Sequence, residues 1–100
     1  MENQDNQLQI ELKEEVAQGT YANLAIITHS SSEFILDFIR VMPGMSKAGV
    51  QSRIVLAPEH AKCLLRALEE NIGKYERTFG AIRMPNEHTF SQLSNVKGEA

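Results

Sequence analysis

The chain has 100 residues, a formal net charge of −3 and one cysteine, Cys63. This length fits one domain, and one thiol excludes both an internal disulfide and a cysteine-based metal cluster. Acidic and basic residues are mixed along the chain, and the negative balance argues against direct nucleic-acid binding, which needs a basic surface. The N-terminus is polar and acidic, unlike a secretory signal, and no apolar run is long enough to span a bilayer, so we expect a cytoplasmic protein.

The first predicted strand spans residues 8–12. Leu8, Ile10 and Leu12 alternate there with polar residues, and a period of two indicates a strand with one apolar face. Residues 1–6 have no apolar side chain apart from Met1. We expect this short N-terminal stretch to be disordered.

Three further strands are predicted in the middle of the chain, over residues 20–28, 33–42 and 50–56. These segments are rich in isoleucine, valine, threonine and phenylalanine, which favour strands. Turn-forming residues separate them, namely the serines that follow His29 and the Pro43–Gly44 pair. The order predicts a simple antiparallel meander.

A long amphipathic helix is predicted from Pro58 to residue 79. Proline is well tolerated as the first helical residue, and Gly80 is placed to end the helix in the left-handed conformation. Apolar residues recur at helical spacing along one side: Ala61, Leu64, Leu65, Leu68, Ile72, Tyr75 and Phe79. The predicted fold is therefore α+β, a four-stranded antiparallel β-meander followed by one long α-helix (ββββα), in a single domain over residues 7–80. Residues 81–100 are predicted to form a mobile C-terminal tail.

The predicted strands carry apolar side chains on both faces, whereas one helix covers only one face of a sheet. An uncovered face of this kind would leave a contiguous apolar patch, which monomers avoid. We therefore predict a homo-oligomer, a homodimer or a dimer of dimers. The predicted oligomer or partner interface consists of Ala25, Ile27, Ile35, Ile39, Val41, Arg53 and Val55. The alternative is that the C-terminal tail folds over this face.

Several short motifs occur in a recognisable order. They are Tyr21-x-Asn23, His29-Ser30, Glu33-Phe34, Asp37-Phe38, Val50-x-Ser52-Arg53-Ile54-Val55-Leu56, Pro58-x-His60-Ala61-Lys62 and Asn71-Ile72-x-x-Tyr75-Glu76. In this order, over residues 8–80, the chain resembles the bacterial family called domain of unknown function 3467. The resemblance implies a small bacterial cytoplasmic protein and supplies no catalytic residue. It also implies a weak link to transcription, because such proteins are often encoded near RNA polymerase subunits. The order of elements is similar, in topology alone, to the SecB-type export chaperone.

No catalytic, cofactor-binding or metal-binding residues are predicted, and no small-molecule substrate is expected. His29, Ser30 and Asp37 contain the residue types of a nucleophilic triad, but His29 and Ser30 are adjacent in a predicted turn, where capping explains them better. The histidines lack the spacing of a zinc site. Arg53 is expected to form a structural ion pair with Glu33 or Asp37, the alternative being a role in anchoring a peptide.

The sequence thus predicts a non-enzymatic, oligomeric protein-interaction module whose partners are itself and another protein. One specific version is chaperone-like binding of extended peptide segments. The alternative is an accessory factor that acts with the transcription machinery through protein contacts. Neither version requires a cofactor, nucleic-acid contact or a membrane.

Overall fold

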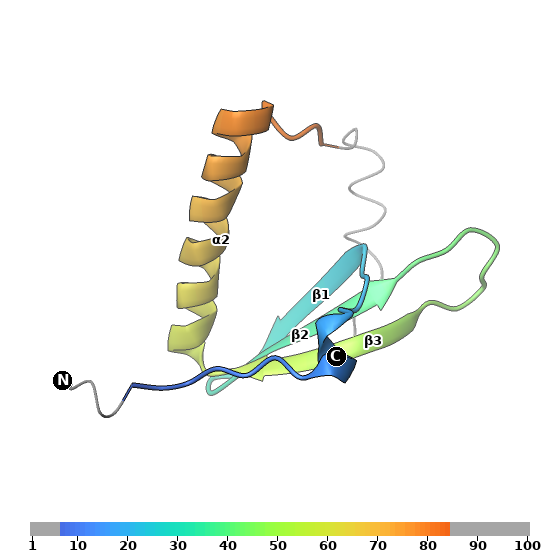
Figure 1. The fold of residues 1–100 in the computed structure, drawn as a ribbon. Coiled ribbons are helices and arrows are strands. Elements are labelled where there is room, and N and C mark those ends of the chain that lie inside the picture. Colours follow the sequence, from blue (N-terminus) through green and yellow to red (C-terminus); the bar gives the residue numbers. More distant parts are fainter. Residues whose placement is uncertain (1–6, 85–100) are drawn as a thin grey trace.

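The computed structural model describes residues 7–84. The disorder predicted for residues 1–6 and the mobility predicted for residues 85–100 lie outside this range. The described chain has the elements α1 (Glu14–Ala17), β1 (Leu24–His29), β2 (Phe34–Arg40), β3 (Gly49–Leu56) and α2 (Pro58–Phe79) (Figure 1). The fold is α+β, with a three-stranded antiparallel sheet followed by a long helix.

The strands lie in the order β1-β2-β3, and two different turns connect them. The β1–β2 turn is tight: the Ser30 N–H donates to the Glu33 carbonyl at 2.9 Å. The longer β2–β3 connection contains Gly44, whose φ of 84° is a conformation that glycine adopts without strain. At the open end of β1, the Asn23 side chain both accepts from the Val41 N–H (2.7 Å) and donates to its carbonyl (3.0 Å). This pair of bonds holds the start of β1 against the end of β2.

A β-bulge in β3 changes which side chains share a face. Phe38 lies opposite Ser52, but the next residue, Ile39, lies opposite Val50, so Gln51 is the extra residue. Val50 therefore joins the face of Ile39. Simple alternation along β3 would place Val50 on the face of Ile54, but the inserted residue reverses the alternation.

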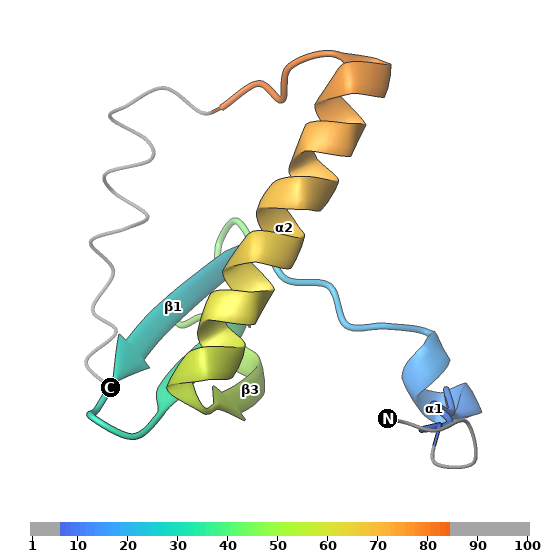
Figure 2. The ribbon, with the colours of Figure 1, turned by 90° about the vertical axis from the view of Figure 1, so that its left-hand side faces the viewer.

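Helix α2 rises from the end of β3 at a steep angle to the sheet (Figures 1 and 2). Its bounds confirm the predicted helix, with Pro58 in the first turn and Gly80 directly after its end. Gly80 has a φ of 97° and a ψ of 167°. This backbone is extended rather than left-handed helical, but it too has a positive φ that favours glycine.

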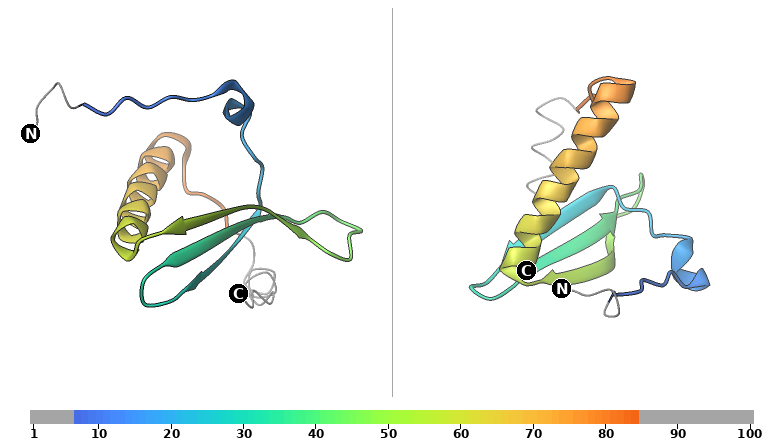
Figure 3. Two further views of the ribbon diagram at one scale, coloured as in Figure 1. Left: turned by 90° about the horizontal axis from the view of Figure 1, so that it is seen from below. Right: turned by 60° about the vertical axis from the view of Figure 1, so that its left-hand side comes forward.

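The predicted first strand does not join the sheet. Residues 7–13, which we call the N-terminal arm, run as extended chain into the short helix α1. The side chains of Leu8, Ile10 and Leu12 are 84%, 90% and 70% exposed. Figures 2 and 3 show α1 and the chain that leads to it standing away from the sheet. The four-stranded arrangement is therefore not confirmed within one copy of the chain.

Very little apolar surface is buried within the described residues. Leu36 (7% exposed) and Ile39 (5%), both on the central strand, are the buried apolar residues there, and α2 contributes none. The helix approaches the sheet only near its own first turns, beside the end of β3 (Figure 3). An amphipathic helix gains most of its stability by burying its apolar side. Most of that side is still in solvent here.

Candidate protein interaction surfaces

The strand register divides the seven predicted interface residues between the two faces of the sheet. Ala25 and Ile27 pair with Phe38 and Leu36, so they lie on the face that also carries Phe34, which we call the groove face. The remaining strand residues of the set, Ile35, Ile39, Arg53 and Val55, lie on the opposite face with Asp37. We call this the ion-pair face.

The prediction that all seven residues share one face is therefore wrong. Val41 lies just beyond the end of β2, at 37% exposure. Alternation within a strand shows which residues share a side, but it does not fix the register against the neighbouring strand. A shift of one residue exchanges the two faces.

The ion-pair face is centred on a bidentate contact between β2 and β3. Arg53 Nε donates to Asp37 Oδ1 at 2.6 Å, and Arg53 Nη2 donates to Asp37 Oδ2 at 2.9 Å. This confirms Asp37 as the partner of Arg53. Asp37 is only 5% exposed, whereas the Arg53 side chain is 55% exposed. The planar guanidinium matches both carboxylate oxygens and still presents an open side to solvent.

The ion pair shifts the titration of Asp37. The hydrogen bonds from Arg53 lower the pKa of Asp37 below its usual value, against the opposing effect of burial. The same bonds raise the pKa of Arg53. Because the folded pKa of Asp37 is depressed, its charged form stabilises the fold above the unfolded-state pKa, near 3.9. That contribution is lost as the pH falls through this value and on through the folded pKa.

Replacing Asp37 with asparagine is therefore expected to make the free energy of unfolding less sensitive to acid. The difference in unfolding free energy between the wild type and Asp37→Asn should be constant near neutral pH and shrink below about pH 4. Urea unfolding between pH 3 and pH 7 measures this difference. Glu33→Gln, at an exposed carboxylate just before β2, is the matched control, and it should change the unfolding free energy at neutral pH less than Asp37→Asn does. A pH-independent difference for Asp37→Asn would contradict the assignment.

An apolar groove lies between the groove face and the first turns of α2. Its volume is about 380 Å³. Nearly all of its lining is apolar, and one charged side chain stands among the lining residues: Ile27, Phe34, Leu36, Pro58, Ala61, Lys62, Leu64, Leu65 and Leu68. Of the residues predicted from sequence as an interface, only Ile27 lines it. The groove exists because α2 leaves the sheet steeply, which the helical periodicity alone did not indicate.

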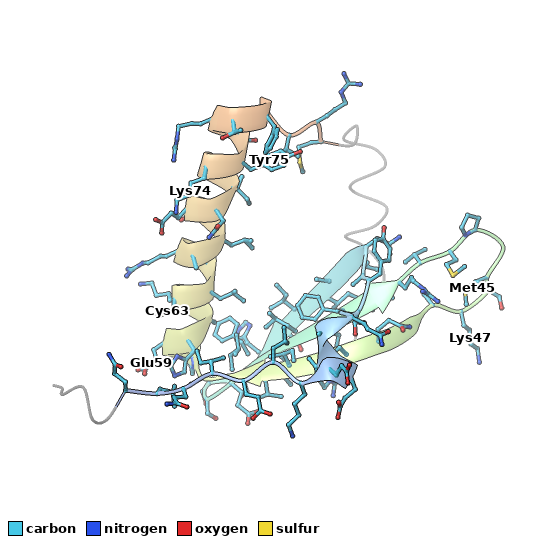
Figure 4. The ribbon with its side chains drawn as sticks, viewed as in Figure 1. Met45, Lys47, Glu59, Cys63, Lys74 and Tyr75 are labelled. Atoms are coloured by element: carbon cyan, nitrogen blue, oxygen red, sulfur yellow. The ribbon has the colours of Figure 1, made fainter. Side chains whose placement is uncertain are left out.

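The far half of α2 carries a second apolar surface, formed by Ile72, Tyr75 and Phe79. We call it the distal stripe. These side chains are 40%, 50% and 72% exposed, and the rings of Tyr75 and Phe79 lie 4.9 Å apart. Figure 4 shows Tyr75 on the side of α2 that faces over the sheet, and Cys63 and Lys74 on the outer side. Cys63 is a free, exposed thiol.

The distal stripe was not among the predicted interface residues, because helical periodicity alone suggests packing against the chain's own sheet. The lengths of the predicted helix and strands nevertheless indicated that part of the helix would extend beyond the sheet. A helix of 22 residues is about 33 Å long. Strands of six to eight residues span about 20–27 Å, so a steeply inclined helix extends beyond them.

The residues considered for catalysis have structural partners. The His29 ring stacks on Phe34 with centroids 5.3 Å apart, and the Ser30 hydroxyl accepts from the Ser32 N–H at 3.2 Å. The turn-capping interpretation of Ser30 is thus confirmed. Over residues 7–84, histidine, cysteine and acidic side chains nowhere gather in threes with the spacing for a metal ion. Within the same range, no helix has the length and hydropathy to cross a membrane.

Comparison with known proteins identifies a family. The model of a family described as "Protein of unknown function (DUF3467)" matches residues 1–84. No curated protein matches the chain, and no solved structure does. The match therefore identifies the kind of chain without assigning a reaction or a ligand to either surface.

Proposed function

We propose, on the premise that the chain belongs to the DUF3467 family of proteins of unknown function, that it is a non-enzymatic, homo-oligomeric protein-interaction module. In this proposal the groove binds an extended apolar segment of another polypeptide. The distal stripe and the N-terminal arm serve self-association. The single observation that carries the proposal is the amount of apolar surface that residues 7–84 leave exposed in one copy.

The chemistry of the groove favours a polypeptide side chain over a small polar substrate. Its volume of about 380 Å³ falls in the usual range of ligand sites, but such sites carry several polar groups that orient the ligand. Here Lys62 is the one charged residue of the lining. Alternate side chains of an extended peptide could enter the groove, while its backbone stays accessible to water at the mouth.

Self-association is supported by the shortage of buried residues. Two apolar residues are buried in the described chain, whereas the distal stripe and the arm remain open to solvent. Burial yields roughly 25 cal/mol per Å² of apolar surface, so covering these surfaces can add several kcal/mol to the marginal stability of a small domain. In the assembled protein we expect residues 8–12 to form the fourth strand of a SecB-like ββββα arrangement.

Filling the groove tests its proposed role. Ala61 lines the groove and is partly buried, so Ala61→Phe should occupy the space that a peptide side chain would take. We expect its affinity for a fluorescein-labelled, unstructured peptide with leucine at alternate positions to fall by about tenfold or more, equivalent to about 1.4 kcal/mol. Fluorescence anisotropy measures the binding.

The matched control is Ala67→Phe, which adds the same side chain to α2 at an exposed position outside the groove. It should bind the peptide as the wild type does. Equal affinities for both variants, or no binding and no protection of an aggregating client by the wild type, would contradict the proposal.

Co-purification at natural abundance distinguishes peptide binding from the alternative function. RNA polymerase subunits as the main partner would favour the transcription accessory factor, and diverse unfolded chains would favour peptide binding in the groove.

A further inference from the structure

The N-terminal arm has the pattern of a strand but no partner strand among the described residues. Leu8, Ile10 and Leu12 lie on one side of an extended segment and are 70–90% exposed. The arm is continuous with α1, which stands away from the sheet of its own chain (Figures 2 and 3). An extended segment with one apolar face is stable only when its backbone and that face are both covered. A sheet edge on a second copy supplies both.

The outer edge of β3 fits the arm better than the outer edge of β1. In the described sheet both edges lack a further strand. Beyond the bulge at Gln51, β3 offers the five residues 52–56, which equals the length of the segment 8–12. β3 presents exposed large apolar side chains on both of its faces, Ile54 at 43% and Val55 at 51%, whereas on β1 the exposed large apolar side chain, Ile27 at 58%, lies on the groove face.

Charge complementarity favours one alignment on β3. When the arm runs antiparallel to β3 with Ile10 opposite Ile54, the apolar side of the arm extends the groove face. Glu11 then lies opposite Arg53 on the ion-pair face. The Arg53 side chain is 55% exposed, so its remaining N–H groups can donate to a second carboxylate beside Asp37. On β1 the same placement would put Glu11 among Leu24, Ile26 and Thr28, and that strand contains no lysine or arginine.

We infer that residues 8–12 of one copy add to β3 of a second copy as an antiparallel fourth strand, with Glu11 opposite Arg53. The exchange is reciprocal, so two copies form a closed, two-fold symmetric dimer in which each sheet gains a strand from its partner. This inference depends on the self-association part of the proposed function. The inference identifies residues 8–12 as the segment, and β3 as the sheet edge, through which the copies associate.

Cross-linking between differently labelled copies tests the partner strand. Full-length chains carrying Cys63→Ser are given one new cysteine each, Gln9→Cys in one and Val55→Cys in the other, and are mixed and mildly oxidised. We expect a covalent dimer of the two chains, since residues 9 and 55 face each other in the proposed register. Mixing Gln9→Cys with Thr28→Cys, on β1, should give no such product. A product at Thr28, or none at Val55, would overturn the inference.

A second variant separates exchange from pairing within one chain. With Gln9→Cys, Val55→Cys and Cys63→Ser in the same chain, exchange predicts dimers linked twice. Linked monomers would overturn exchange. In addition, Ile10→Ser should raise the dimer dissociation constant by about tenfold or more, whereas Gln9→Ser, on the opposite side of the arm, should change it little. If the wild type is oligomeric and Ile10→Ser leaves its dissociation constant unchanged, the strand exchange is refuted but self-association is not. If the wild type is a monomer, self-association itself is refuted.

Discussion

Replacing Ile72 and Phe79 together with glutamine is expected to convert the protein from an oligomer to a monomer at micromolar concentration. Both side chains belong to the distal stripe, on the half of α2 that extends past the sheet (Figure 1). Burying each one contributes about 1.5–3 kcal/mol, and every copy loses both. The dissociation constant should rise at least about a hundredfold. Light scattering and analytical ultracentrifugation over a range of concentrations measure the change.

The matched control is Glu70→Gln with Arg77→Gln, two substitutions on the opposite side of the same helix. They leave the net charge unchanged, and glutamine has nearly the same helix propensity as the residues it replaces. The Lys74–Glu70 ion pair that is lost is exposed and contributes little. The mass of this control should equal that of the wild type. If the wild type is monomeric at high concentration, or if both pairs of substitutions act alike, the distal stripe has no role in assembly.

The elements of the fold could be predicted from local sequence, because each has a local cause. The helix of α2 follows from the spacing of its apolar residues, its first proline and its final glycine, and the structure places its bounds accordingly. Strands β1, β2 and β3 follow from composition and turn residues. The sequence narrowed the partner of Arg53 to Glu33 or Asp37, because the strands that contain Arg53 and Asp37 were expected to be neighbours.

The predictions that failed concern features that are set by non-local geometry. The register between β1 and β2 places Ala25 and Ile27 on one face of the sheet and Ile35 and Ile39 on the other. No residue of either strand fixes this register alone. The inserted Gln51 reverses the alternation in β3. The steep departure of α2 creates both the groove and the distal stripe. The spacing of apolar residues along a helix does not fix the angle at which it leaves a sheet. The sequence predicted more apolar surface than one helix covers, but it did not predict where that surface lies.

Replacing Leu36 with alanine is expected to lower the free energy of unfolding by about 2–5 kcal/mol. Leu36 is 7% exposed on the central strand, and it has a cross-strand neighbour on each side, Ile27 and Ile54. It also lines the groove beneath α2. Small domains have a total stability of about 5–15 kcal/mol. With two buried apolar residues in the described chain, the loss of one removes a large fraction of the core.

Urea unfolding at one fixed protein concentration measures this loss, since an oligomer's stability depends on concentration. Met45→Ala is the matched control, because it also shortens a large apolar side chain, but in the exposed β2–β3 loop (Figure 4). Its effect should stay within about 0.5 kcal/mol. If Leu36→Ala lowered the free energy of unfolding no more than this control does, burial of Leu36 on the central strand would not be a main source of stability. The exposed surfaces, rather than the few buried side chains, would then have to supply nearly all of the stability, and only the assembled form would be folded.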